Sequence, residues 1–243
     1  MPADATHREG VVSPLLTPLC THIVLIRHGE TDWNVVRRLQ GHTDIPLNET
    51  GQQQAQQAAI ALADTPLAAL YSSDLLRAQA TADAIAAPHG LAVQLVPALR
   101  ERHYGVFEGL CSDEIAAQHP AAFAAWQTRD TTYVIPGGES LSDLYRRVCA
   151  AFGQIVAHHA GQTIGLVAHG GVLDCLYRLV NKLPLGSPRD FPLRNASLNW
   201  VVHMLEQGVG RFQVERWGEV GHLKGVDPTK AALAQDEIDP RVL

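Results

Sequence analysis

The residues best suited to chemistry lie between Ile26 and Thr31, directly after the apolar run at 23–25. A short run rich in β-branched residues predicts a buried strand, and a charged pair such as Arg27 and His28 at its end does not fill a core. Open α/β sheets bind ligands in the crevice beyond their strand ends. A guanidinium that grips phosphate beside a nucleophilic imidazole therefore indicates phosphate chemistry. Taken alone, the motif is equally typical of a structural histidine.

A second segment repeats this arrangement. The apolar run at 165–168 ends in His169, and Gly170 and Gly171 lead into an expected helix. Glycines let the backbone approach a ligand closely, and the free N–H groups at a helix start attract an anion. Two strands that each deliver a histidine to one edge of a sheet argue against a purely structural role for both.

Two further segments supply a cation and a carboxylate. Arg77 lies in the first turn of the helix expected after the strand at 69–73, although a solvated surface position is the ordinary alternative. Glu101 follows the strand expected at 93–99. Two arginines and two histidines would form a cationic cradle for a transferring phosphoryl group. His28 could then attack phosphorus to give phosphohistidine, and Glu101 is the best-placed carboxyl group to protonate the leaving alkoxide.

A divalent metal has no obvious place in this chemistry. The sequence contains neither a P-loop nor an aspartate-rich cluster, and it has no His-Glu-x-x-His motif. We therefore expect no metal site. A metal-dependent phosphoesterase stays as a remote alternative, which loss of activity in EDTA would revive.

The elements that would position these residues alternate between strand and helix. The alternating patterns at 198–203 and 212–217, with a glycine-rich break between them, predict an antiparallel hairpin. The alternation indicates a mainly parallel sheet with helices on both faces and an antiparallel addition. Besides the first strand and the hairpin, strands are expected at 69–73, 93–99 and 163–168, and helices at 51–64, 75–87 (stopped by Pro88 and Gly90), 112–129 in short pieces, 141–155 and 172–180.

Composition limits the kinds of protein that this chain can be. Its 243 residues, 46% of them hydrophobic, can bury the core of one domain or at most two. The net charge of −6 and the lack of basic clusters argue against nucleic acid as a partner. The four scattered cysteines, without Cys-x-x-Cys spacing, are typical of reduced thiols rather than of disulfides or a zinc site.

The two ends of the chain differ from its middle. Residues 1–20 contain three prolines and no apolar segment long enough for a signal peptide, and no stretch of membrane-spanning length occurs. We expect a flexible leader at 1–20, a domain at 21–224 and a flexible tail at 225–243. These features predict a cytoplasmic protein without a membrane partner, and they indicate no particular oligomeric state.

Four blocks resemble the signature segments of the histidine phosphatase superfamily, which contains cofactor-dependent phosphoglycerate mutases and many phosphohydrolases. The resemblance runs from about Ile23 to Trp217 and covers most of the expected domain. It implies an α/β protein with a three-layer α/β/α sandwich, in which a mainly parallel sheet carries an antiparallel C-terminal addition. The blocks, in the family's order, are Leu25–Thr31, Ser72–Thr81, Leu99–Gly109 and Val167–Gly171.

The resemblance also implies roles for individual residues. His28 would be the phosphoryl acceptor and Glu101 the proton donor. Phosphate would be bound by Arg27, Arg77 and His169. The positions that line the family's pocket beside the phosphate correspond in this chain to Thr31, Asn34, Gln40, Gly41 and Gly170. The remaining wall of the pocket is expected to come from residues 111–136.

The choice between mutase and hydrolase depends on cations. Arg102 and Tyr104 match mutase positions that help to hold the substrate, although they could simply pack the pocket rim. Mutases carry a Lys where this chain has Ser112, an Asn where it has Gly171, and an adjacent Arg pair where it has only Arg129. A mutase must retain a bisphosphorylated intermediate, so missing cations favour its release and attack by water.

We therefore predict a phosphohydrolase that cleaves phosphate monoesters of small metabolites through phosphohistidine and needs no cofactor. The first alternative is a cofactor-dependent phosphoglycerate mutase, which would convert 3-phosphoglycerate to 2-phosphoglycerate and would require 2,3-bisphosphoglycerate. The second alternative is a catalytically idle protein that binds a phosphorylated ligand, because fold alone does not establish activity.

Overall fold

The computed structural model describes residues 19–206 and 208–226. Its centre is a six-stranded sheet with the strand order β3-β2-β4-β1-β5-β6. The first four of these strands are parallel, whereas β5 runs antiparallel to β1 and β6 antiparallel to β5. The strands are β1 (Leu19–Arg27), β2 (Leu67–Ser72), β3 (Val93–Leu95), β4 (Thr163–Ala168), β5 (Leu198–Glu206) and β6 (Val209–Glu219).

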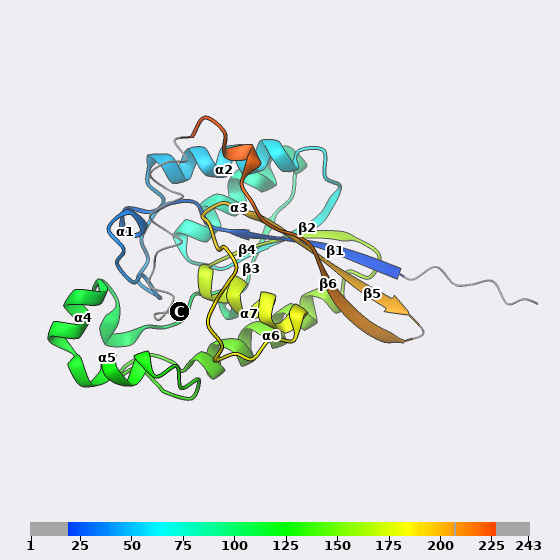
Figure 1. The fold of residues 1–243 in the computed structure, drawn as a ribbon. Helices are drawn as coiled ribbons and strands as arrows, with labels where there is room; N and C mark the ends of the chain where they lie inside the picture. The colour runs from blue at the N-terminus through cyan, green and yellow to red at the C-terminus, as the bar shows by residue number, and fades with distance from the viewer. Residues whose placement is uncertain (1–18, 207, 227–243) are drawn as a thin grey trace, which may run out of the picture.

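Helices cover both faces of this sheet (Figure 1). On one face lie α2 (Glu49–Leu62) and α3 (Leu76–His89), and on the other lie α6 (Leu141–Ala157) and α7 (Gly170–Asn181). Residues 23–26 of β1 are completely buried because they face a helical layer on each side. The predicted three-layer α/β/α sandwich, with a mainly parallel sheet and an antiparallel C-terminal addition, is confirmed.

The helix α6 forms as its sequence predicts. The Ser140 side chain accepts a hydrogen bond from the Asp143 N–H at 3.1 Å and so caps the first turn. Its apolar residues recur at helical spacing, and Leu144, Val148 and Phe152 are wholly buried against the sheet and α7.

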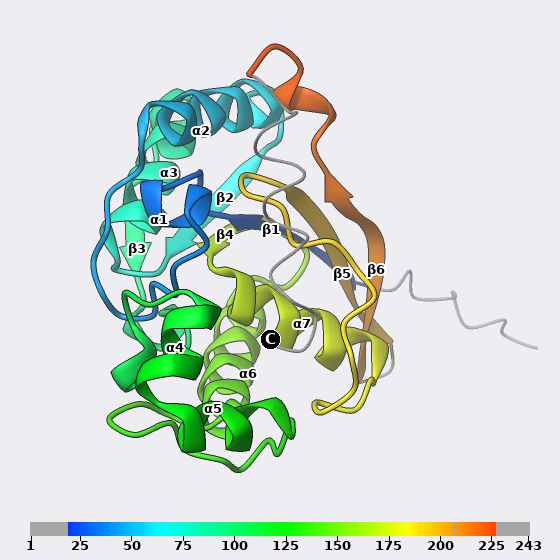
Figure 2. The same cartoon turned by 60° about the vertical axis from the view of Figure 1, so that its left-hand side comes forward.

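Three short helices lie at the end of the molecule where the parallel strands finish (Figures 1 and 2). They are α1 (Asp32–Val35), α4 (Ser112–Gln118) and α5 (Pro120–Gln127). A separate small core joins α4 and α5 to the loops around them, and its buried members are Leu39, Tyr104, Phe107, Ile115, Trp126 and Ile135.

Several predicted strands differ from the structure at their ends, β1 and β3 among them. β1 begins at Leu19, so the first strand is longer than its most apolar part suggests. β3 ends at Leu95, and a 3-10 turn at Pro97–Leu99 replaces the rest of the strand expected at 93–99. Proline has no N–H to donate to a neighbouring strand, so the ladder cannot continue past this position.

Predicted helix ends also differ, as in α3 and α7. α3 does not stop before Pro88, which is exposed in its last turn. The helix ends at His89 and is capped by Gly90 with φ +63°. α7 begins at Gly170 rather than at 172 and reaches Asn181. The glycine pair is therefore part of the first helical turn.

Most of the expected leader and tail lies outside the described residues. Leu19 and Cys20, placed in the leader by prediction, belong to β1. No disulfide links the four cysteines, all of which lie in the described ranges. Of the helices in the described ranges, none combines the length and apolarity needed to cross a membrane.

Candidate active site

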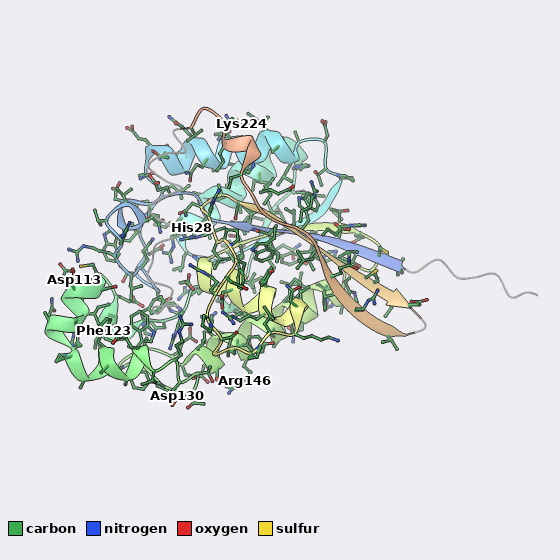
Figure 3. All side chains as sticks on the ribbon, viewed as in Figure 1. His28, Asp113, Phe123, Asp130, Arg146 and Lys224 are labelled. Carbon is green, nitrogen blue, oxygen red and sulfur yellow. The ribbon has the colours of Figure 1, made fainter. Side chains whose placement is uncertain are left out.

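The carboxyl ends of three neighbouring strands bring the predicted residues together. β1 and β4 are parallel, with Arg27 opposite Ala168, so the next residue of each strand is a histidine. The His28 N–H donates to the Ala168 carbonyl at 2.9 Å, and the His28 and His169 ring centroids are 5.1 Å apart. β2 pairs with β4 on its other side, and Arg77 follows in the first turn of α3. Figure 3 places His28 near the end of β1.

The hydrogen bonds of His28 determine its tautomer. Its Nδ1 lies 2.7 Å from the carbonyl oxygen of Gly29, which can only accept, so Nδ1 carries a proton. Burial, followed by the positive charges of Arg77 and Arg27, lowers the pKa of His28 well below its usual value. The ring is therefore neutral near pH 7, and Nε2 carries a lone pair.

The loop that follows β1 is held from the far end of the sequence. The Asn195 side-chain amide donates to the carbonyl of His28 at 2.7 Å and to that of Gly29 at 3.1 Å. It thereby orders the backbone that fixes the His28 ring.

His169 lies against His28 and is completely buried. Burial, together with Arg77, His28 and Arg27, lowers its pKa well below the usual value. Neither of its ring nitrogens has a hydrogen-bond partner within the described residues. Because buried polar atoms are normally hydrogen-bonded, this ring is available to a polar group bound beside His28.

Arg77 is 1% exposed, so the surface alternative for this residue is wrong. Its guanidinium donates to the carbonyls of Thr43 at 3.0 Å and Gly41 at 2.8 Å. Burial lowers its pKa to about 10, which leaves it protonated near pH 7. Arg27 is also buried and donates to the Leu193 carbonyl. Two buried cations beside neutral imidazoles create a strongly positive site that suits a phosphate.

The carboxylate of Glu101 meets the first turn of α7. The Gly171 N–H lies 3.1 and 3.0 Å from its two oxygens, and Oε1 also accepts from the Arg102 N–H at 2.8 Å. A Cβ at position 171 would lie 2.3 Å from Oε1. Glycine at this position is therefore what allows Glu101 to reach the helix.

A pocket of about 50 Å³ lies among these groups, enough for a phosphoryl group or a few waters. Among the predicted residues, it is lined by Arg27, His28, Asn34, Gln40, Gly41, Arg77, Glu101, Tyr104 and Gly170. Four further lining residues were not predicted as such from the sequence: Arg38, Leu39, Gly171 (noted only as a departure from mutases) and Arg189.

Three predicted residues do not line this pocket. His169 lies beside it, as described. Thr31 caps α1 through a reciprocal set of hydrogen bonds with Asn34, which does line the pocket. Arg102 is buried, with its guanidinium 5.8 Å from the centre of the Tyr104 ring, so it packs behind that side chain. Burial also raises the pKa of Tyr104, which keeps its hydroxyl protonated.

The expectation that residues 111–136 form the wall of this pocket is wrong. Ile115 and Trp126 from this segment pack in the small core behind Tyr104. The Glu114 carboxylate instead pairs with Arg38, at 2.5 and 2.9 Å from its two terminal nitrogens.

Arg189 reaches the pocket from the loop between α7 and β5. The buried Arg178 anchors this loop by donating to the Pro184 carbonyl at 2.8 Å and the Ser187 hydroxyl at 2.7 Å. Arg178 is held in turn by Asp174, 2.7 Å away on the same face of α7. The spacing of the acid and the arginine, four residues apart on a helix, was the only local signal for this anchor.

Within the ranges that the structure describes, no group of three or more His, Cys, Asp or Glu side chains is arranged to hold a metal ion.

Comparison with known proteins agrees with this geometry. The family profile of the histidine phosphatase superfamily (branch 1) matches residues 23–220. The chain is 41% identical over 205 residues to phosphoglycerate mutase-like protein 4 of Arabidopsis thaliana, covering 83% of this chain and 86% of that protein. It is 40% identical over 213 residues to the metal-independent phosphoserine phosphatase of the same plant, covering 85% and 84%. The structure of a mycobacterial glucosyl-3-phosphoglycerate phosphatase has a TM-score of 0.72 at 33% identity, covering 82% of this chain and 99% of that chain. The chain therefore belongs to the histidine phosphatase superfamily, branch 1, and is an enzyme.

Proposed function

We propose that this enzyme is a phosphohydrolase that removes phosphate from small-molecule phosphate monoesters through a phosphorylated His28. The observation that carries the proposal is the geometry at His28, where the Gly29 carbonyl lies 2.7 Å from Nδ1 and the two nearby arginines, Arg27 and Arg77, are buried. In this geometry the ring presents Nε2 as a nucleophile where a bound phosphate would lie.

In the first step, Arg27 and Arg77 bind the phosphate oxygens and His169 adds a hydrogen bond. Nε2 of His28 forms a bond to phosphorus while the bond from phosphorus to the ester oxygen breaks. Glu101 gives its proton to that leaving oxygen, which departs as an alcohol. The His28 ring gains positive charge, which the Gly29 carbonyl stabilises through the Nδ1 proton.

In the second step, a water molecule attacks phosphorus. The Glu101 carboxylate accepts a proton from this water, and the bond between phosphorus and His28 breaks. Free phosphate leaves, and both side chains return to their starting states. The two steps are attacks on one phosphorus atom, so one set of cations serves both.

Hydrolysis is favoured over phosphoryl return to a second substrate oxygen. Position 171 carries no side chain, and Ser112 offers no charge where mutases have a lysine. Arg38 is already paired with Glu114. A bisphosphorylated intermediate would therefore have few firm anchors beyond the phosphate cradle and would leave before it could reorient.

A phosphoglycerate mutase is the second candidate, because two further arginines, Arg38 and Arg189, line the pocket. In that case 2,3-bisphosphoglycerate would be the cofactor. The third possibility, an idle phospholigand-binding protein, is not retained, because the chain belongs to an enzyme family and keeps His28 and Glu101.

The substrate class follows from the relatives. The pocket of about 50 Å³ has room for the phosphoryl end of an ester. Two relatives are named for phosphoserine and glucosyl-3-phosphoglycerate, which are both small esters. We further propose that the enzyme works in the cytoplasm. We also propose that it needs no metal, since Arg27 and Arg77 supply the positive charge.

The test is a screen of phosphorylated metabolites that records free phosphate and, in parallel, conversion of 3-phosphoglycerate to 2-phosphoglycerate. We expect phosphate release that persists in EDTA and is lost in His28→Ala. Strong mutase activity stimulated by 2,3-bisphosphoglycerate, with little free phosphate, would overturn the hydrolase proposal in favour of the mutase. Loss of activity in EDTA, restored by a divalent cation, would overturn the metal-free mechanism.

A further inference from the structure

The proposed proton donor lies on a stretch of backbone that has no regular partner. Residues 101–104 belong to no helix or strand. Carbonyl groups in such a stretch must find hydrogen bonds outside a ladder or a helical turn, or the backbone will shift. Glu101 must nevertheless stay at the pocket, because proton transfer requires a precise distance to the leaving oxygen.

A single guanidinium supplies the missing donors. Arg147, on α6, donates to the carbonyls of Ala98 at 2.8 Å, Arg100 at 2.7 Å and Glu101 at 2.8 Å. The planar fork of arginine carries five N–H donors in fixed directions, whereas a lysine ammonium is a single point. The carbonyl of Glu101 also accepts from His42 Nε2 at 2.9 Å, on the loop that contacts Arg77.

The guanidinium is itself fixed by a carboxylate. Glu139 accepts from Arg147 at 3.1 Å and 2.5 Å through its two oxygens, in the loop just before α6. Glu139 also forms two hydrogen bonds with His103, which lies further along the same stretch. Its carboxylate accepts from the His103 N–H, and its own N–H donates to the His103 carbonyl, each at 2.9 Å. A Cβ at Gly138 would lie 2.4 Å from that carbonyl, so the two segments are in direct contact.

The neighbouring Arg146 provides an internal contrast. Its side chain is 75% exposed and pairs with Asp143, three residues earlier on the same helix. Figure 3 labels it at the outer margin of the molecule, away from His28. The Arg147 side chain is 24% exposed and spans from α6 to the stretch that carries Glu101.

We propose that Arg147, held by Glu139, is a positioning residue that sets the place of the Glu101 carboxylate through the backbone carbonyls at 98, 100 and 101. Arg147 does not line the pocket and acts only through Glu101. The inference rests on the proposed function, in which Glu101 protonates the leaving oxygen.

The test compares leaving groups in the first turnover, so that later hydrolysis of the phosphoenzyme does not intervene. Alcohol release is measured by rapid quench for p-nitrophenyl phosphate, whose leaving group needs little protonation, and for β-glycerophosphate, whose leaving group needs full protonation. The variants are Arg147→Met, Arg147→Lys, Glu101→Gln and the double variant Glu101→Gln/Arg147→Met. Arg146→Met is the matched control on the adjacent residue.

We expect Arg147→Met to slow the cleavage of β-glycerophosphate about 10- to 100-fold, which is the usual cost of misplacing a catalytic group by about 1 Å. The cleavage of p-nitrophenyl phosphate should slow less than about 3-fold. In the Glu101→Gln background, Arg147→Met should cause almost no further loss of rate, because both substitutions affect the transfer of the same proton. Arg147→Lys should recover little of the rate on β-glycerophosphate, and Arg146→Met should cleave both substrates at the parent rates. Should Arg147→Met not fold, as judged by its melting curve, the comparison is made with Arg147→Lys.

Equal losses on both substrates, or losses that multiply in the double variant, would overturn the positioning role. A Glu101→Gln variant that cleaves β-glycerophosphate at the parent rate would overturn the acid role of Glu101 and this inference with it. A normal Glu101→Gln defect combined with a harmless Arg147→Met would overturn the inference alone and leave the proposed function standing.

Discussion

The N–H of Gly171 points between the two carboxylate oxygens of Glu101, at 3.1 and 3.0 Å. This contact joins the segment after β3 to the first turn of α7, so the proposed acid and the two histidines share one rigid frame. Its existence depends on the missing side chain at position 171, where a Cβ would lie 2.3 Å from Glu101 Oε1.

Gly171→Ala should therefore displace Glu101 without disrupting α7, since alanine favours a helix. We expect hydrolysis of alkyl phosphates to fall about 10- to 100-fold, with a smaller effect on p-nitrophenyl phosphate. Gly153→Ala in α6 is the matched control, because a Cβ there meets no atom within 4 Å. The control should keep full activity and gain roughly 0.4–1 kcal/mol of unfolding free energy. Unchanged alkyl phosphate hydrolysis in Gly171→Ala would show that Glu101 can act from another position.

His28 should become covalently phosphorylated during turnover. Its Nε2 carries the free lone pair because Nδ1 donates to Gly29. Rapid quench with a labelled substrate should trap an acid-labile, base-stable label, which His28→Ala abolishes. A label on serine or aspartate, or an active enzyme without any label, would contradict the mechanism.

Arg77→Ala should cost far more activity than a typical surface arginine. Removing one charged donor from a transition-state clamp costs on the order of 2–4 kcal/mol, or about 30- to 1,000-fold in rate. The control is Arg211→Ala, at an exposed position on β6, which should be silent. The measurement is kcat for p-nitrophenyl phosphate with a melting curve for each variant. Near-normal turnover in Arg77→Ala would show that Arg77 does not stabilise the transition state.

The stability of the enzyme should fall as the pH drops below about 6.5, the usual pKa of histidine in an unfolded chain. The pKa values of His28 and His169 are lowered by burial, so the unfolded chain binds protons there that the folded protein does not. Each histidine then contributes a loss approaching about 1.4 kcal/mol per pH unit below this point.

This dependence is measured by urea unfolding between pH 8 and 5, with His28→Gln as the comparison, because glutamine does not titrate. The variant should lose less stability on acidification than the parent. Identical pH dependence in the two proteins would mean that His28 is not held neutral in the folded state.

Some of the site could be read directly from local sequence. Arg27, His28 and His169 follow apolar runs, and a strand buried on both faces needs only such a run to be recognised. Once the sheet is parallel, residues after neighbouring strands must meet at one edge. The local patterns also predicted the helix at 141–155 and the C-terminal hairpin, because helical spacing and alternation depend on residues close together in the chain.

Other features of the site were determined only by the tertiary structure. Asn195 holds the backbone of His28 from 167 residues away, and Arg147 reaches Glu101 across 46 residues. Arg38 and Arg189 enter the pocket from irregular loops, where side-chain direction follows no period. A hydrogen bond between distant residues leaves no trace in local periodicity. Its partners are chosen by which carbonyls and charges the packed layers leave without a partner, and this is known only after the layers have packed.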